Sequence, residues 1–251
     1  MLHCNVTMAV RGRSLAGLVA ALGLLLAHPV AAAPSAVSSG VPAPTMTGPI
    51  VGGLRGGPWG ASIDDLESAG YVEEEYFFSG TADSRDLTGA LDGRRSAEYT
   101  TRMLVRRPKS AEAFNGTVLM EWFNVTAEMD FGVLWGMSHV ELLRGGYAYA
   151  GVSVQKVGVD ASPLALKLWD PVRYLPLQHP GDAYAFDIWS QAARALVARD
   201  GPSPLGTLRP KRILASGESQ SAAYMIPYVN RVDPDHRTFD GFLAHSYPGR
   251  I

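Results

Sequence analysis

Hydrophobic and polar positions along this 251-residue chain predict strands and helices in alternation. Short apolar runs have the length of buried parallel strands, and one longer segment, 182–199, repeats its apolar side chains at helical spacing. Strands that alternate with helices imply a doubly wound α/β layer around a mostly parallel sheet. The predicted strands are 71–78, 98–107, 117–122, 147–154, 213–216 and 239–245, and the predicted helices are 131–143, 182–199 and 222–231.

The first 33 residues have the pattern of a secretory leader. Arg11 and Arg13 form a positive start, 15–27 is an apolar run that is short for a membrane span, and Ala31–Ala33 offers a small-residue cleavage site. We therefore expect export to the periplasm or the outside of the cell, with cleavage near Ala33. An uncleaved membrane anchor is the alternative.

Removal of this leader changes the composition of the mature chain. The single cysteine, Cys4, would be lost, so the mature protein would hold no disulfide and no thiol nucleophile. Two arginines and no acidic residue would also be lost, which leaves 20 basic against 24 acidic residues and a net charge of −4. This balance does not indicate nucleic acid or an anionic membrane as a partner.

Residues 34–62 are rich in alanine, proline, serine and glycine, and we expect them to form a flexible lead-in. The glycine-rich run 51–57 within them is followed by Pro58 and lacks a Gly-Lys-Ser/Thr sequence, so it indicates turns rather than a phosphate loop. A single domain, 63–251, accounts for the rest of the chain.

The predicted strand 213–216 leads into Gly217-Glu-Ser-Gln-Ser221 and then into a predicted helix. A serine at the apex of a sharp strand–turn–helix is the layout of a nucleophile elbow, which needs small residues on both sides. Gly217 supplies the first small residue, and Ser221 takes the second place, where glycine is usual. Ser219 is therefore the candidate nucleophile.

Gly-x-Ser alone is weak evidence, because it occurs six times in the chain. The serine at position 219 is the one with a predicted strand before it and a predicted helix after it. The alternative is that Ser219 only caps that helix, which serines often do.

Several segments, together with the elbow, resemble the α/β-hydrolase superfamily. In particular they resemble a bacterial family described only as an alpha/beta hydrolase domain of unestablished substrate, whose elbow is Gly-x-Ser-Gln-Ser. The resemblance implies the α/β-hydrolase fold and a serine hydrolase. Together with the leader, it leads us to expect a secreted esterase that acts on small-molecule esters through an acyl-enzyme on Ser219. The matching segments are 71–76, 99–108, 114–118, 121–125, 146–155, 179–182, 217–222 and 239–242.

Acyl transfer also needs N–H donors for the tetrahedral oxyanion, each contributing on the order of 3 kcal/mol. The resemblance implies the backbone N–H of Gln220 as one donor and the loop after strand 117–122 as the source of the other. Asn124 is our choice in that loop, with Phe123 close behind; the alternative is that Asn124 only shapes the turn. Glu121 and Trp122 are expected to support the strand end.

In this superfamily the acid and the histidine follow the serine in sequence. His245 lies at the correct edge of the predicted sheet but early for the usual base, whereas His236 is predicted at the opposite edge. His139 and His179 precede the serine and match no metal-ligand spacing, so no metal and no cofactor is expected.

The sequence ends soon after the sixth predicted strand, so it resembles the first two-thirds of such a hydrolase, truncated after strand 6. We therefore expect poor esterase turnover and an open strand edge that favours association. The alternative function is a non-catalytic pseudoenzyme or binding module that retains the elbow. A nucleotide-binding protein is disfavoured, because the phosphate signatures are absent. The residues carry no signature of a particular substrate or oligomeric state.

Overall fold

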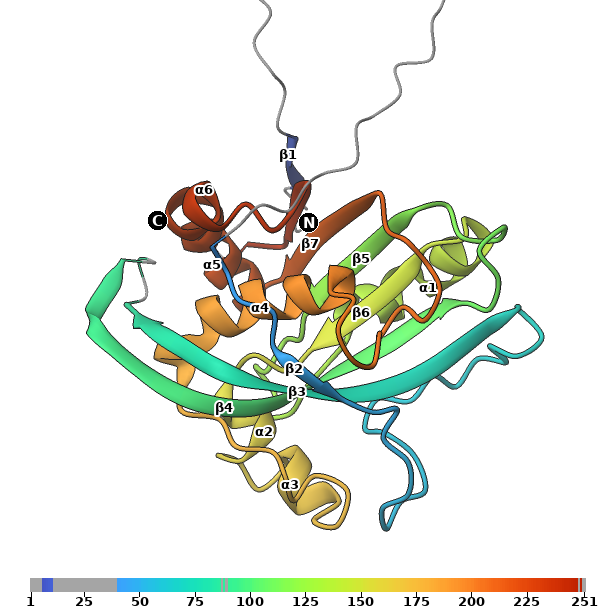
Figure 1. Cartoon of the computed structure of the whole chain (residues 1–251), viewed down its shortest axis with the longest axis horizontal. Helices are drawn as coiled ribbons and strands as arrows, with labels where there is room; N and C mark the ends of the chain where they lie inside the picture. The colour runs from blue at the N-terminus through green and yellow to red at the C-terminus, as the bar shows by residue number, and fades with distance from the viewer. Residues whose placement is uncertain (1–5, 11–39, 87, 89, 248, 250–251) are drawn as a thin grey trace, which may run out of the picture.

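The computed structural model describes residues 6–10, 40–86, 88, 90–247 and 249, which form one sheet with helices on its faces (Figure 1). The strand order is β1-β8-β7-β5-β6-β4-β3-β2. Strands β6, β5, β7 and β8 run parallel to one another, and the remaining pairs are antiparallel. The strands are β1 (Val6–Val10), β2 (Thr45–Thr47), β3 (Tyr71–Arg85), β4 (Leu91–Pro108), β5 (Thr117–Trp122), β6 (Ala148–Val152), β7 (Arg212–Glu218) and β8 (Gly241–His245).

Six α-helices connect these strands within the described residues, with a 3-10 turn at Asp182–Tyr184 and a π-helical turn at Tyr228–Val232. In the chain that the structure describes, no helix is both long enough and apolar enough to cross a membrane. The helices are α1 (Val133–Arg144), α2 (Lys156–Val159), α3 (Leu166–Trp169), α4 (Ala185–Val197), α5 (Gln220–Pro227) and α6 (Asp233–His236).

The central strand β5 shows how the sheet is covered on both faces. Its side chains alternate between the two faces, as a strand requires. Val118, Met120 and Trp122 belong to the core formed with α4 and α5, whereas Leu119 belongs to the core formed with α1. All six residues of β5 are buried, so its apolar run 118–120 is explained by burial on both sides. The predicted α/β-hydrolase fold, mostly parallel in this later part of the chain, is confirmed.

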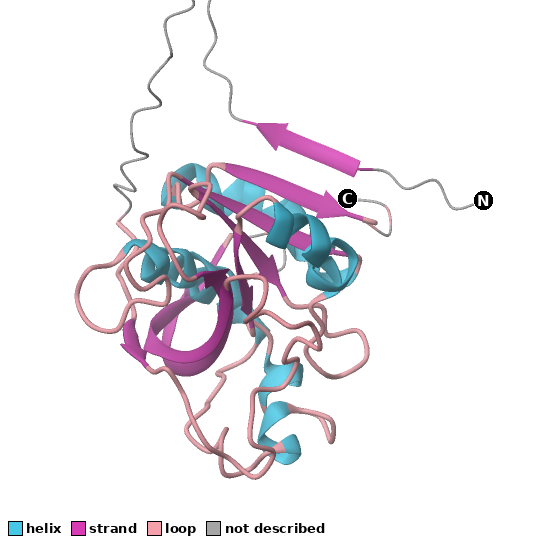
Figure 2. Ribbon diagram, turned by 90° about the vertical axis from the view of Figure 1, so that its right-hand side faces the viewer, coloured by secondary structure: helices cyan, strands magenta, loops and turns pink. Residues whose placement is uncertain are grey.

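The first two long strands differ from the prediction in length. β3 and β4 continue well beyond the predicted 71–78 and 98–107 and pair with each other from Tyr71–Pro108 to Arg85–Leu91. Figure 2 shows that this hairpin curls strongly. The residues near 83–95 carry little apolar periodicity because Thr81, Asp83, Arg95 and Ser96 of the outer hairpin are exposed, so a period-based prediction ends too early.

The segment 34–62 also differs from the expected flexible lead-in where the structure describes it. Thr45–Thr47 forms β2 beside β3, and the Ile50 N–H donates to the carbonyl of Glu75 at 2.7 Å. Arg173 donates to the carbonyls of Ile50 and Gly52. Buried arginine donors therefore hold a segment whose own composition predicts no regular structure.

Most of the predicted leader lies outside the described residues. Val6–Val10 is the exception and forms β1, antiparallel to β8. The free edge expected on the last strand is therefore covered by this segment in the chain as given. Cleavage near Ala33 stays a prediction, and it would remove β1.

Candidate active site

Ser219 lies in a sharp turn between β7 and α5, as the sequence predicts. Its backbone has φ 53° and ψ −110°, and it is one of four described residues other than glycine with a positive φ. Positive φ is unfavourable for a residue with a Cβ and persists where the surroundings enforce it. Ser219 makes no capping hydrogen bond to α5. The alternative, a serine that serves only as a helix cap, is therefore wrong.

Gly217 allows the strand and the helix to approach each other. A Cβ built on Gly217 would lie 2.8 Å from Cγ of Met225 and 2.9 Å from the backbone carbonyl of Ser221. Glycine is required here by close packing, because the residue does not have a positive φ.

Ser221 has a more specific place than the small-residue rule suggests. Its Oγ donates to the carbonyl of Glu218 at 2.9 Å and accepts the Glu218 N–H at 2.9 Å. Ser221 is fully buried, so these two bonds satisfy both backbone groups of Glu218 inside the turn. Glycine at this position would offer neither bond.

Asn124 connects the loop after β5 to the turn. Its side-chain amide donates to the carbonyl of Glu218 at 2.9 Å and to the Glu218 carboxylate at 3.1 Å. Its backbone N–H donates to the carbonyl of Phe131 at 3.0 Å, and its Oδ1 accepts the Thr126 N–H. The N–H that we expected to serve an oxyanion is thus already engaged, so Asn124 is a positioning residue in this geometry.

The next residue, Val125, fits that role better. It is buried, and its N–H makes no hydrogen bond within the described part of the chain. The N–H of Gln220, the first residue of α5, has no partner within its own helix, because the first four N–H groups of any helix lack one.

Gln220 also belongs to a polar network that sequence reasoning missed. Its side-chain amide donates to Oε1 of Gln155, which also accepts the indole N–H of Trp122, both at 3.0 Å. Gln155 in turn donates to Asp182 at 3.0 Å. Gln155 lies three residues after the end of β6. Because sites form beyond the carboxyl ends of parallel strands, this position could have indicated Gln155 from the sequence.

Glu121 supports the site from the opposite face of β5. Its carboxylate accepts the N–H groups of Leu134 and Trp135 at the start of α1, at 2.8 and 3.2 Å, and the hydroxyl of Tyr149 at 2.6 Å. Burial raises the pKa of Glu121 to about 7, and these hydrogen bonds oppose the increase. The indole N–H of Trp122 donates to Gln155. Glu121 and Trp122 thus both hold neighbouring segments at the end of β5, as expected.

The four described histidines occupy different environments. His139 lies on α1 against Trp135. His236 contacts Ser190 of α4 and Arg85 of β3. His179 is buried between the Val154 carbonyl and the Gly181 N–H, and burial lowers its pKa to about 4. His245 is the histidine beside the turn.

His245 lies next to the elbow through the backbone. It pairs with Glu218 in the β7–β8 register, and its carbonyl accepts the Ser219 N–H at 2.9 Å. Its Nδ1 is 3.1 Å from Oγ of Ser246, which has a positive φ of 51°. The sequence therefore placed His245 at the correct edge, and its catalytic role stays a prediction.

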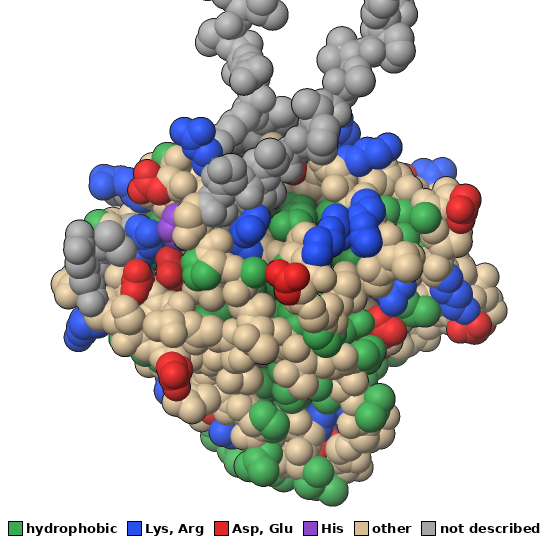
Figure 3. Space-filling model, in the orientation of Figure 1, with side chains coloured by type: hydrophobic (Ala, Val, Ile, Leu, Met, Phe, Trp, Pro, Cys, Tyr) green, Lys and Arg blue, Asp and Glu red, His purple; other side chains and the backbone are tan. Residues whose placement is uncertain are grey.

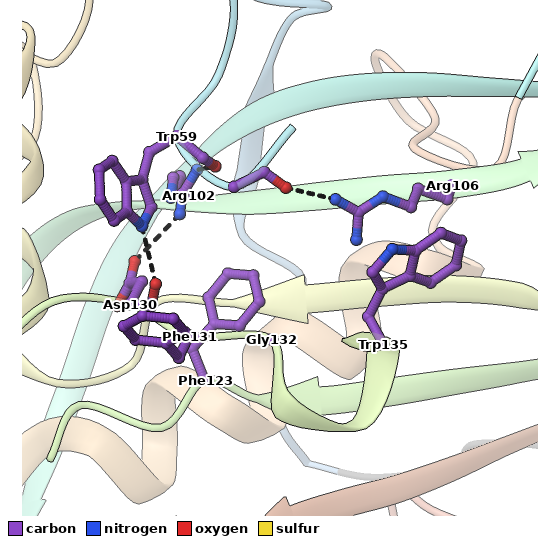
Figure 4. A pocket seen from close by; sticks show the side chains of 9 residues that line it. Trp59, Arg102, Arg106, Phe123, Asp130, Phe131, Gly132 and Trp135 are labelled. Carbon is purple, nitrogen blue, oxygen red and sulfur yellow. Dashed lines mark hydrogen bonds and ion pairs between the residues drawn. The ribbon is translucent and has the colours of Figure 1, made fainter. Parts of the chain in front are cut away.

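A cavity of about 360 Å³ lies on the α1 side of the loop that contains Asn124 (Figure 4). Phe131 joins it to the elbow, because Phe131 and Asn124 exchange backbone hydrogen bonds and Asn124 binds Glu218. Ser219 itself is not among the lining residues. The wall consists of Trp59, Gly60, Arg102, Arg106, Phe123, Asp130, Phe131, Gly132 and Trp135.

No group of histidine, cysteine or acidic side chains with the arrangement of a metal site occurs among the residues that the structure describes. The turn holds a serine whose backbone is strained, next to the first N–H groups of α5.

One family model and several solved structures match the chain. No curated protein matches the chain. Similar solved structures include the esterase Est22, at 16% identity and a TM-score of 0.40 over 69% of this chain and 43% of that one. A prolyl endopeptidase is 16% identical with a TM-score of 0.37 over 67% and 20% of the two chains. A cold-adapted esterase from an Arctic intertidal metagenomic library is 16% identical with a TM-score of 0.30 over 61% and 55%.

The chain spans between 20% and 43% of the length of the first three solved structures that it matches. A model of the family described as "Alpha/beta hydrolase domain" matches residues 46–250, which is most of the sequence and includes the turn at Ser219. The chain therefore belongs to the alpha/beta hydrolase domain family.

Proposed function

We propose that the protein is an exported serine hydrolase that cleaves small-molecule carboxylic esters through an acyl-enzyme on Ser219. The observation that carries the proposal is the backbone of Ser219, held at positive φ without a capping hydrogen bond. A serine that merely ended a strand would not need this strain. Strain of this kind is typical of residues whose side chain must be presented to a ligand.

In the proposed reaction the Ser219 Oγ attacks the ester carbonyl carbon and the base takes the hydroxyl proton. The base returns this proton to the alkoxy group, which leaves as an alcohol, and water then hydrolyses the acyl-serine to the acid and free Ser219. The negative charge on the carbonyl oxygen would be stabilised by the N–H groups of Gln220 and Val125. Asn124 supports this arrangement, because its bonds to Glu218 and Phe131 fix the loop that carries Val125. Donors held in advance cost no reorganisation when the charge develops.

A base must accept the Ser219 proton, and His245 is the candidate among the described residues because its backbone adjoins Ser219. The other three described histidines have partners on α1, on α4 or under the 155–184 segment. The partner acid of the base is not assigned.

A non-catalytic binding module that keeps the elbow is the second candidate. The strained backbone of Ser219 by itself requires no base, so the same turn is compatible with a binding module. The two candidates differ in one result, which is whether Ser219 turns over an ester.

The test is hydrolysis of a series of aryl acetates and butyrates by the wild type and by Ser219→Ala. We expect Ser219→Ala to lose at least a hundredfold of the wild-type rate, since nucleophile removal leaves only binding and oxyanion stabilisation. Ser62→Ala is the matched control: Ser62 also belongs to a Gly-x-Ser sequence, but its Oγ binds Asp64 away from the turn. Equal rates in Ser219→Ala and the wild type would contradict the proposal.

A further inference from the structure

The cavity beside the elbow combines aromatic walls with two arginines, Arg102 and Arg106, and one carboxylate, Asp130. Trp59, Phe123, Phe131 and Trp135 line it, and its volume of about 360 Å³ is in the range of small-ligand pockets. Trp59 is held in place by its indole N–H, which donates to the carbonyl of Asp130 at 2.7 Å. Phe131 is 48% exposed and forms the rim, so a ligand can enter there.

Arg106 is the arginine of the wall that keeps one terminal nitrogen without a protein partner among the described residues. Its side chain is 2% exposed, its Nε donates to Glu73 at 2.6 Å, and one terminal nitrogen, Nη2, donates to the Gly60 carbonyl at 2.5 Å. The guanidinium carbon lies 4.2 Å from the ring centre of Trp135. Figure 4 shows the guanidinium beside Trp135, with its remaining nitrogen turned toward the cavity.

That remaining nitrogen, Nη1 of Arg106, makes no hydrogen bond with any residue that the structure describes. Nη1 is not among the buried unpaired polar atoms, so it is accessible from the cavity and can donate to a ligand oxygen in place of water. The other unpaired polar atom of the wall, Oδ1 of Asp130, is directed elsewhere, because a Cβ built on Gly158 would lie 2.2 Å from it. Arg106 is thus the donor available to a ligand.

The remaining charges of the wall are paired within the protein. Arg102 binds both Glu75, at 2.8 Å, and Asp130, at 3.2 Å, with side chains that are essentially unexposed. Glu73 balances the charge of Arg106 and is 15% exposed, so solvent screens it more than the arginine. An oxygen acceptor of either neutral or anionic character therefore meets Arg106 without another free charge competing for it.

We propose that this cavity is the subsite for an aromatic substrate group that carries an oxygen acceptor, with Arg106 donating to the oxygen and Phe131 and Trp135 contacting the ring. The proposal rests on the proposed function in one respect, which is that the group belongs to the ester cleaved at Ser219. The loop 123–131 makes the connection, because Phe123 and Phe131 line the cavity and Asn124 between them binds the residue before Ser219.

The test is calorimetric titration of the protein with benzoate and benzamide, which carry an anionic and a neutral acceptor on the same ring, and with acetate, which lacks the ring. We expect at least one ring compound to bind at millimolar concentration or below and acetate not to bind. Arg106→Lys keeps the positive charge but removes the planar set of guanidinium N–H donors, and it should weaken the binding of the ring compound about tenfold. Phe131→Ala removes the rim and should also weaken it about tenfold.

Val140→Ala is the matched control, because Val140 is exposed on the outer side of α1 and does not line the cavity. Ser219→Ala should bind as the wild type does, so failure of the nucleophile and failure of the subsite give separate results. The proposal is overturned if neither ring compound binds, or if both cavity variants bind as tightly as Val140→Ala. Phe131→Ala keeps the test decisive should Arg106→Lys unfold, since Phe131 is half exposed.

Discussion

At Ser219 one residue shows how neighbouring side chains impose an unfavourable backbone. Gly217 has no Cβ, so α5 can pack closely against β7. The Ser221 hydroxyl bonds to both the N–H and the carbonyl of Glu218. The His245 carbonyl holds the Ser219 N–H from the adjacent strand. These contacts fix the turn from both sides, so the hydroxyl of Ser219 is presented without a local hydrogen bond to the helix.

Gly217→Ala tests this account at the residue scale. The new Cβ would lie 2.9 Å from the Ser221 backbone, which cannot move without moving the helix. We expect the free energy of unfolding to fall by about 1–3 kcal/mol, as overpacking does, and ester hydrolysis to fall with it.

Gly136→Ala is the control for that change, read by urea unfolding. Gly136 lies within α1, and a Cβ there meets no atom within 4 Å. The same substitution should stabilise the protein by roughly 0.5–1 kcal/mol, because alanine favours helix. Equal effects at the two positions would show that the turn tolerates a side chain.

Among the elements, the start of α1 is capped by a carboxylate of the neighbouring strand β5 and not by a side chain of its own. Gly132 precedes α1 without a capping side chain, and the first turn of α1 contains no acidic residue. Glu121 reaches across from β5 and accepts two of the first N–H groups. The cost is a buried carboxyl whose pKa is raised to about 7 by desolvation.

Glu121 therefore makes stability depend on pH. Its pKa is higher in the folded chain than in the unfolded one, so between about 4.5 and 7 the folded state binds more protons. The stabilisation is present at low pH and is lost as pH rises through 7. We expect the wild type to lose about 2–3 kcal/mol relative to Glu121→Gln between pH 5 and 8.

Urea unfolding at the two pH values measures this difference. Glu141→Gln serves as the control, because Glu141 is exposed on α1 and pairs with Arg144. A parallel pH dependence in wild type and Glu121→Gln would contradict the raised pKa.

In the whole molecule, a buried ionic cluster connects segments that are far apart in sequence. Glu75 of β3 accepts from Arg102 of β4 and from Arg173, which also holds the carbonyls of Ile50 and Gly52. Asp130 adds the loop that carries Asn124. The cluster thus fixes the positions of the β3–β4 hairpin, the segment 50–52 and the loop 123–131 relative to one another.

The end of the molecule near α3 has a different surface. Figure 3 shows apolar side chains gathered there, and Leu164, Leu168, Val172 and Leu175 are each about half exposed or more. They lie in the 155–184 segment, whose inner residues Leu166 and Leu177 pack against Tyr174. This segment therefore combines a buried inner layer with an apolar outer one.

The sequence predicts the parts of the fold that follow from periodicity and from turn chemistry. The apolar run of β5, the amphipathic α4 and the small residues around Ser219 all repeat a local rule, and the structure has them within a few residues of the prediction. Asn124, Gln155 and Arg106 are different. Their roles depend on contacts with Glu218, Gln220 and Glu73 across the fold, and no spacing along the chain encodes those contacts.

The most direct test of the central claim is the position of a fluorophosphonate adduct, read by mass spectrometry of peptides from the whole protein. We predict that the adduct lies on Ser219 and is absent in Ser219→Ala, because in the proposed mechanism the serine of the strained turn is the nucleophile and backbone N–H groups would stabilise the charge that develops during attack. Ser62→Ala should be labelled as the wild type is. An adduct on another serine, or no adduct on Ser219 in the wild type, would contradict the account.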